Sequence, residues 1–199
     1  LGMDYMRAGL LDRAESLFRE LIDGNLHVTA ALRQLVLIYQ QEQDWDRAIT
    51  FARRLDQAGG GRQGPVIAHF ECEKAEIALD SGALARARAA VGRALAEDTA
   101  CVRASLIEAR IAASERRYED AIRALERIEE QDADFMPEAF PHIVNCYRSL
   151  GRIDTLKRYL EGLRRRRRGV TPVLLLADLT AEEGDAEGAL AYLREEMER

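Results

Sequence analysis

The hydrophobic residues of this chain follow a helical period along much of its length. Apolar side chains recur three or four positions apart, as at Ala14, Phe18 and Leu21 and again at Leu32 and Leu35. Residues at this spacing share one face of a helix, and such a face is buried against a neighbouring helix. Small residues on these faces let helices approach closely, while large ones fill the gaps. The pattern therefore predicts pairs of packed helices.

A short phrase marks the turn inside each pair. It begins with a turn residue, usually glycine, and ends on the small or apolar residue that opens the buried face of the second helix. It returns six times, ending at Ala14, Ala48, Ala87, Ala121, Leu156 and Ala189. The steps are 34, 39, 34, 35 and 33 residues, and a period of 34 is the signature of the tetratricopeptide repeat. We expect an all-α superhelix of about six helix-turn-helix repeats.

The predicted repeats cover residues 1–24, 29–58, 66–98, 101–132, 137–168 and 171–199. The long step comes from a glycine-rich insertion at residues 59–65, which is expected to be an exposed loop. Pro137 and Pro172 suit the starts of helices, where a missing amide proton costs little. Pro141 is expected in a first turn, so its helix should begin near Phe140 or be kinked.

The third and fourth repeats depart from the pattern in their first helices. Glu71, Lys74 and Glu108 stand where large apolar side chains are expected, as does Ser105. Lys74 and Glu108 have the same offset in neighbouring repeats, whose first helices stack side by side. We therefore predict an ion pair between them, which would confer register more than stability.

Composition and charge narrow the function classes. With 47% hydrophobic and 32% charged residues the chain is typical of a globular protein, and its net charge of -6 argues against nucleic-acid partners. The sequence lacks the phosphate-loop, zinc-protease and nucleophile-elbow motifs, so we predict that it is not an enzyme. No apolar run is long enough to span a bilayer. The chain begins without methionine and ends within a charged helix, as expected of a fragment.

Three cysteines lie far apart in the sequence, which favours a reducing cytoplasm over a disulfide framework. His69 with Cys72, and His142 with Cys146, each share a helix face and together resemble a zinc ligand set. The two pairs are two repeats apart, however, and repeats contact mainly their neighbours. We predict no metal and no cofactor in this chain.

A run of five arginines follows the second helix of the fifth repeat: Arg164, Arg165, Arg166, Arg167 and Arg168. Positive charge is favourable at a helix C-terminus, so a solvated helix end is the simpler interpretation. The alternatives are contact with an anionic membrane surface or with an acidic protein.

Stacked repeats present their first helices to a concave groove that suits another polypeptide. The register places the following partner-binding candidates there: Arg33, Leu37, Gln40, His69, Glu76, Arg103, Leu106, Arg110, Asn145 and Arg148. The arginines can receive carboxylates bidentately, so an acidic or C-terminal peptide is one predicted ligand class. The alternative is that they form ordinary soluble surface.

Three segments go beyond what the repeat pattern demands. LGMDYMRAGLLDRAE at residues 1–15, IAHFECE at 67–73 and LLAD at 175–178 closely resemble the lipopolysaccharide assembly protein B family of Gram-negative bacteria. The resemblance covers the whole chain. It implies an N-terminal membrane anchor, a repeat array on the cytoplasmic face of the inner membrane, and a C-terminal rubredoxin-type domain that binds iron or zinc. We expect the anchor and the metal domain to lie outside this sequence, which has no C-x-x-C motif.

The resemblance implies an adaptor rather than a catalyst. Members of the family work with the membrane protease FtsH to degrade the deacetylase of the lipid A pathway, which limits lipopolysaccharide synthesis, and an inner-membrane regulator of lipopolysaccharide opposes them. A homodimer is also expected, because end repeats expose apolar faces. The alternative is a generic interaction module of another bacterial assembly system, since the fold alone does not set a function.

Overall fold

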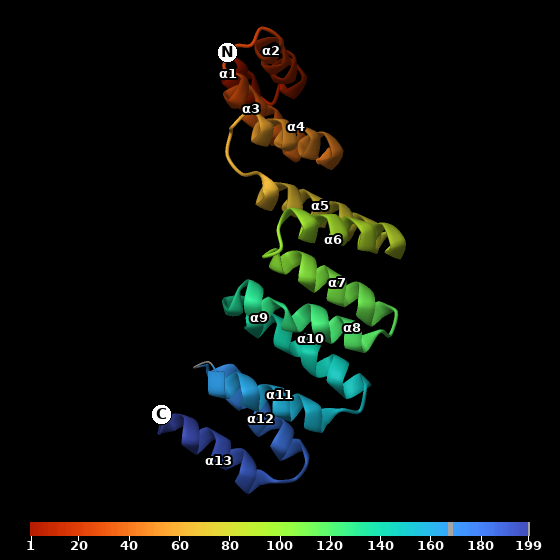
Figure 1. Ribbon diagram of the computed structural model, residues 1–199, viewed down its shortest axis with the longest axis vertical. Coiled ribbons are helices and arrows are strands. Elements are labelled where there is room, and N and C mark those ends of the chain that lie inside the picture. The colour runs from red at the N-terminus through yellow and green to blue at the C-terminus, as the bar shows by residue number, and fades with distance from the viewer. Residues whose placement is uncertain (167–168, 199) are drawn as a thin grey trace. The chain divides into compact units, whose positions relative to one another are not determined.

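The computed structural model describes residues 1–166 and 169–198, and these residues form helices and turns without a strand. The helices follow one another with short connections (Figure 1). Their bounds are α1 Gly2–Arg7, α2 Leu11–Asp23, α3 Val28–Gln41, α4 Trp45–Gln57, α5 Gly64–Asp80, α6 Leu84–Glu97, α7 Val102–Ser114, α8 Tyr118–Glu126, α9 Ile128–Gln131, the 3-10 helix η1 Ala133–Phe135, α10 Met136–Ser149, α11 Ile153–Arg166, α12 Val170–Glu182 and α13 Ala186–Met197.

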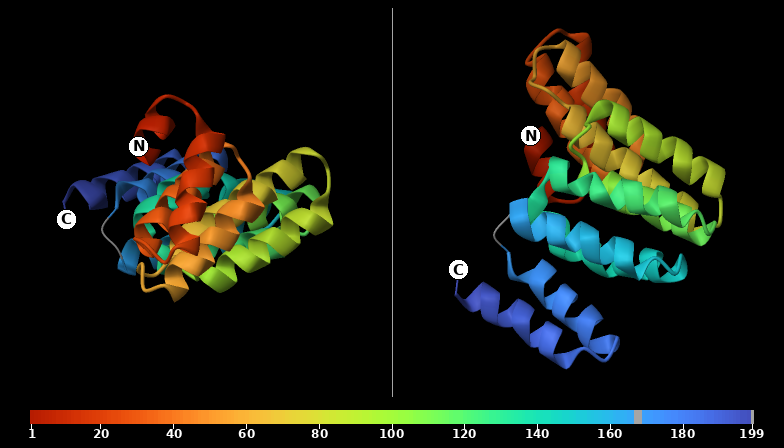
Figure 2. Two further views of the ribbon diagram at one scale, coloured as in Figure 1. Left: turned by 90° about the horizontal axis from the view of Figure 1, so that it is seen from above. Right: turned by 60° about the horizontal axis from the view of Figure 1, so that its bottom comes forward.

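The chain divides into two compact units, residues 1–111 and 112–199. In the first unit α1 packs on α2, α3 on α4 and α5 on α6, and each pair also meets the next. In the second unit α8 packs on α10, and α12 and α13 form the hairpin drawn in blue in Figure 2. The predicted all-helical fold of paired helices is confirmed. No helix among the described residues has both the length and the apolar character needed to cross a membrane.

The repeated phrase is explained by the backbone of the turns. In every pair the residue five positions before the end of the phrase has a positive φ, between 57° and 90°, and the six residues are Gly9, Gln43, Gly82, Arg116, Gly151 and Gly184. The amide of the next residue donates to the carbonyl five residues back, at 2.8–3.2 Å, which is the bond that closes a Schellman turn. Glycine recurs because it adopts this left-handed conformation without strain.

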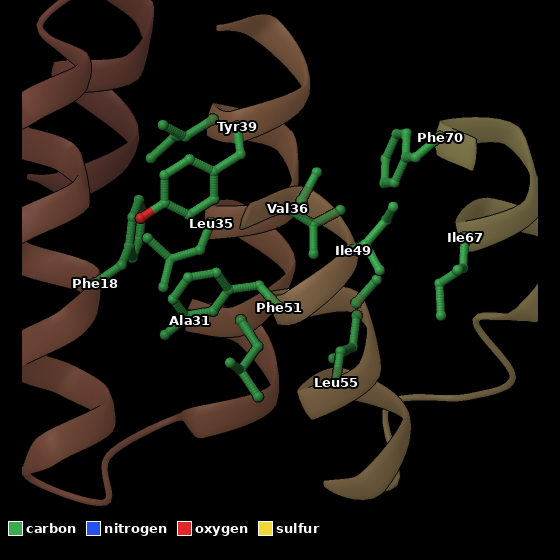
Figure 3. Close-up of a cluster of buried hydrophobic side chains, with 14 of the residues drawn as sticks. Phe18, Ala31, Leu35, Val36, Tyr39, Ile49, Phe51, Leu55, Ile67 and Phe70 are labelled. Carbon is green, nitrogen blue, oxygen red and sulfur yellow. The ribbon is translucent and has the colours of Figure 1, made fainter. Parts of the chain in front are cut away.

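Aromatic and branched side chains fill the core of the first two helix pairs (Figure 3). Tyr39 of α3 stacks on Phe51 of α4 with ring centroids 5.2 Å apart. The Tyr39 hydroxyl donates to Glu15 at 2.6 Å and accepts from Arg19 at 2.8 Å, so its polar end is satisfied inside the cluster. Trp45 stacks on Phe70 with ring centroids 5.7 Å apart, which joins α4 to α5.

The third pair packs on small residues instead. The buried core between α5 and α6 contains Ala68, Ala75, Ala78, Ala87, Ala90 and Ala94. Small side chains allow two helices to lie close together, and α5 and α6 contact each other more extensively than α3 and α4 do. The third pair is therefore held together by close packing of small side chains rather than by aromatic rings.

The charged residues of the third pair find partners that the sequence did not indicate. Glu71 is 3% exposed, and the guanidinium of Arg93 in α6 donates two hydrogen bonds of 2.9 Å to its carboxylate. Lys74 Nζ lies 2.5 Å from Asp46 of α4 and 3.9 Å from Glu71. The structure thus gives Lys74 two carboxylate partners other than the predicted Glu108, and the pairing of Lys74 with Glu108 stays a prediction.

Two predictions about breaks in the helices need correction. The glycine-rich connection ends at residue 63, since α5 begins at Gly64 with Pro65 in its first turn. The helix that holds Pro141 begins at Met136, so Pro141 lies inside α10 rather than in its first turn. Pro141 is exposed, and so is Pro137, whose carbonyl loses the helical hydrogen bond. Water can therefore satisfy that carbonyl.

Candidate binding surface

The binding candidates of the first unit lie on α3, α5 and α7, the first helices of their pairs. A group of five side chains gathers on α5 and α7, and we call it the charge cluster: His69, Glu73, Glu76, Arg103 and Arg110. Four of the five, His69, Glu76, Arg103 and Arg110, were predicted to line the groove, and Glu73 was not. The structure thus brings together predicted residues from the third and fourth repeats.

Arg103 is the centre of the charge cluster. Its guanidinium lies 2.6 Å from Glu73 and 3.0 Å from Glu76, and 3.3 Å from the Nδ1 atom of His69. Burial opposes its charge, but the hydrogen bonds to Glu73 and Glu76 outweigh that effect and raise the pKa of Arg103. Arg110 lies 3.8 Å from Glu76. The cluster is therefore internally balanced, and a carboxylate from a ligand must compete with Glu73 or Glu76 for these arginines.

The candidates on α3 are arranged differently. Arg33 donates to the carbonyl oxygen of Gly60 at 2.9 Å, so it fastens the glycine-rich connection to α3. Leu37 is 48% exposed, and Gln40 is exposed beside it. Leu106 of α7 is half-buried. The two exposed residues leave an apolar and a polar contact on α3 open to solvent, whereas Arg33 already has an acceptor.

The second unit contains a pocket of about 340 Å³ between α10 and α12. Its lining is mainly apolar and includes Phe140, Val144, Leu175 and Leu179. The predicted residues Asn145 and Arg148 also line it, together with Asp178, Glu182, Pro137, Pro141 and Thr171. A pocket of this size holds one or two apolar side chains, with polar groups available to a neighbouring main chain.

Arg148 is paired within this pocket. Its guanidinium lies 2.7 Å from both carboxylate oxygens of Glu182. Both side chains are largely exposed, so water competes for the pair. As with the charge cluster, the sequence identified the arginine but not its internal partner. The carboxylate-binding role predicted for the arginines stays a prediction, and Arg33, Arg103, Arg110 and Arg148 all have acceptors inside the chain.

The arginine run is only partly exposed. Arg164 has 11% of its side chain exposed, lies 2.7 Å from Glu195 and packs over the ring of Tyr192 at 5.6 Å. The hydrogen bond to Glu195 raises the pKa of Arg164. Arg166 lies 3.2 Å from Glu129, and Arg165 is exposed. Arg167 and Arg168 lie outside the described residues. Arg164 is therefore a packed side chain rather than part of a solvated helix end.

The two predicted histidine and cysteine pairs separate in the structure. Cys72 and Cys146 are buried, whereas His69 and His142 are exposed. Within residues 1–166 and 169–198, no group of three or more histidine, cysteine or acidic side chains is arranged to hold a metal ion. The sulfur of Cys72 instead lies 3.8 Å from that of Cys101, a juxtaposition that spacing along a single helix could not reveal.

The sequence of this chain matches a known protein family. A tetratricopeptide-repeat model matches residues 1–62 and 72–134, which is more than half of the chain. The chain belongs to the tetratricopeptide-repeat family. A crystal structure of the MamA protein, 17% identical, covers 85% of this chain and 90% of its own with a TM-score of 0.47.

The predicted resemblance to lipopolysaccharide assembly protein B is confirmed. The chain is 34% identical to the protein of that name from Escherichia coli K12 over all 199 residues. It is 31% identical over 160 residues to the one from Haemophilus influenzae. The chain spans about half the length of the Escherichia coli relative, 51%, and 40% of the Haemophilus influenzae relative.

Proposed function

We propose that this chain is the non-catalytic adaptor region of a regulator of lipopolysaccharide synthesis. Identity of 34% along the entire chain to lipopolysaccharide assembly protein B carries the proposal. The fold supports it, because tetratricopeptide repeats present side chains from successive helices to a polypeptide partner. In this proposal the chain acts at the cytoplasmic face of the inner membrane, where it joins the protease FtsH to the deacetylase of the lipid A pathway so that the deacetylase is degraded.

The pocket between α10 and α12 is proposed to receive apolar side chains of the deacetylase. Its lining combines buried Phe140, Val144 and Leu179 with an exposed ion pair of Arg148 and Glu182. Burial of one leucine-sized side chain contributes about 1.5–3 kcal/mol, which is enough to anchor an extended segment. The open ion pair allows polar groups of the segment to exchange with water at low cost.

The charge cluster is proposed to set specificity. Glu73 and Glu76 neutralise Arg103 and Arg110 in the free chain, so a partner gains little from one carboxylate alone. A partner that offers both a carboxylate and a cation can replace the internal pairs in full, and one with the wrong pattern leaves a charge uncompensated. The inner-membrane regulator of lipopolysaccharide would oppose the adaptor by competing for such a surface.

Binding to the purified components tests the proposal. The chain is immobilised, and its dissociation constants for the deacetylase and for the cytosolic part of FtsH are measured. Arg110→Glu places a third carboxylate beside Glu76 and is expected to weaken binding to one of the two partners at least tenfold, about 1.4 kcal/mol. Arg13→Glu is the matched control, because it changes an exposed arginine on the second helix α2.

The outcomes separate the parts of the proposal. Failure of the wild-type chain to bind either component contradicts the adaptor function. Binding that Arg110→Glu and Arg13→Glu weaken equally contradicts the assignment of the charge cluster to specificity. In a reconstituted degradation assay, the chain should accelerate loss of the deacetylase, and unchanged degradation would reject the link between the two proteins.

A further inference from the structure

Two thiols from neighbouring helix pairs meet inside the first unit. Cys72 stands in the middle of α5 with none of its surface exposed, and Cys101 is the residue immediately before α7. Their sulfur atoms are 3.8 Å apart, although 29 positions separate the residues in the sequence. A disulfide needs about 2.05 Å between sulfurs, so side-chain rotation and a small shift at the start of α7 bring them into bonding range.

The surroundings of the two thiols assign them different roles. The hydrogen bond from the Cys72 thiol lowers the pKa of Cys101, and the backbone amide of Ala104 in the first turn of α7 adds to this against the effect of burial. The same hydrogen bond, together with burial, raises the pKa of Cys72. Cys101 is also partly exposed, so a small reagent in solvent can reach it. Cys101 is therefore the nucleophile, and Cys72 is the neighbouring thiol that keeps its proton.

We propose that Cys72 and Cys101 form an oxidisable dithiol whose substrate is a small hydroperoxide. The Cys101 thiolate attacks the terminal oxygen of the peroxide, the O–O bond breaks, and the leaving oxygen departs as water or an alcohol after taking a proton. Cys101 becomes a sulfenic acid. The sulfur of Cys72 then attacks that sulfur, the S–O bond breaks, and the oxygen leaves as water with the Cys72 proton. Two thiols lose two electrons in total, and the peroxide gains them.

The disulfide would act on the charge cluster directly. Cys72 precedes Glu73 in α5, and Arg103 follows Cys101 by two residues. The bonds of Arg103 to Glu73 and Glu76, at 2.6 and 3.0 Å, therefore span the same two helices as the sulfur contact. Drawing the first turn of α7 towards Cys72 changes the positions of these partners. Oxidation thus links the redox state of the solvent to the arrangement of a surface arginine.

Peptide mapping of the full chain tests the proposal. The native protein is treated with hydrogen peroxide, remaining thiols are alkylated in denaturant, and the digest is analysed by mass spectrometry. We expect a peptide pair joined through Cys72 and Cys101 that has lost two hydrogens, with Cys146 alkylated, and we expect dithiothreitol to reverse the change. The crosslink should also raise the Tm of the oxidised chain by about 5–10 °C.

Three variants define the chemistry. Cys72→Ala should leave a sulfenic acid on Cys101 that dimedone traps, Cys101→Ser should abolish peroxide consumption, and Cys146→Ala, the matched control, should form the disulfide like the wild type. If a variant fails to fold, the rates of alkylation in the native wild-type chain decide the matter, with Cys101 expected to react at least tenfold faster than Cys146. Disulfides between chains, oxidation of Cys146 before Cys101, or direct passage of Cys101 to a sulfinic acid would overturn the proposal.

Discussion

The buried carboxylate of Glu71 makes the stability of the third helix pair depend on a single arginine. Glu71 is 3% exposed, and both of its oxygens accept hydrogen bonds of 2.9 Å from Arg93. Replacement of Arg93 by alanine leaves a buried charge whose remaining cation, Lys74, lies 3.9 Å away. Arg93→Ala should therefore destabilise the chain, and the free energy of unfolding measures by how much.

The expected loss follows from the two bonds and their exposure. Hydrogen bonds to charged groups contribute about 1.5–3 kcal/mol each. Arg93 is 46% exposed, so water and Lys74 recover part of this when the arginine is removed. We expect a net loss of about 2–3 kcal/mol, which lowers the Tm of a chain of this size by roughly 4–12 °C. Urea unfolding followed by circular dichroism gives the free energy of unfolding, and thermal unfolding gives the Tm.

Two further variants show whether the buried charge is the cause. Arg86→Ala, on the same helix, removes an exposed arginine and should change stability by less than about 0.5 kcal/mol. The double change Glu71→Leu with Arg93→Met replaces the ion pair by apolar groups and should restore or exceed wild-type stability. The reasoning is refuted if Arg93→Ala costs no more than Arg86→Ala, or if the double variant is as unstable as the single one.

Three other predictions follow from local geometry. Gln43→Gly should stabilise the chain by about 0.5–1 kcal/mol, because glycine adopts a φ of 57° without strain. Gly82→Ala, at a φ of 72°, should destabilise the chain by about 1 kcal/mol. Thermal unfolding measures both effects. Gly64→Ala would place a Cβ atom 2.6 Å from a backbone oxygen of α6 and should lower the free energy of unfolding by about 1–3 kcal/mol. Gly92→Ala has open space around its new Cβ atom and should raise that free energy by about 0.5–1 kcal/mol. Equal effects of the two changes in urea unfolding would contradict this. Burial raises the pKa of Glu126 despite a hydrogen bond from Tyr147, so the folded chain binds this proton more tightly than the unfolded one. Ionised Glu126 therefore lowers the free energy of unfolding, and this loss is recovered as the pH falls through the raised pKa. Glu126→Gln should stabilise the chain at pH 7. It should also reduce the pH dependence of the free energy of unfolding above the ordinary glutamate range.

The sequence predicts the helix pairs well because each pair is determined by residues that lie close together in the sequence. A turn residue, a small residue and an apolar face recur at fixed offsets, and the Schellman turns at Gly9 and Gly82 obey the same rule as those at Gln43 and Arg116. Helix starts are less certain. Pro141 lies inside α10 because the carbonyl it leaves unpaired is at an exposed position, a fact that depends on tertiary structure.

The partners of long charged side chains could not be predicted in the same way. The offset of Lys74 places it on a first helix, but its flexible stem brings its Nζ atom to Asp46 on the preceding pair, a partner that the register does not indicate. Arg103 was recognised as a surface residue, yet its bond to Glu73 depends on how α5 and α7 pack. Cys72 and Cys101 hold different offsets in their repeats, so no periodic argument brings them together.

The turns inside the pairs have a consequence for how such chains vary. Each one has three residues and is closed by the same hydrogen bond within its own pair. The connections between pairs in the first unit have four or six residues instead, and the same closing bond occurs at residues 24–27 and 58–63 but not at 98–101. Insertions and deletions in related chains should therefore accumulate between the hairpins and spare their interiors. A labelled peptide spliced into residues 58–63 is a practical way to attach a reporter, because every hairpin keeps its own closing bonds.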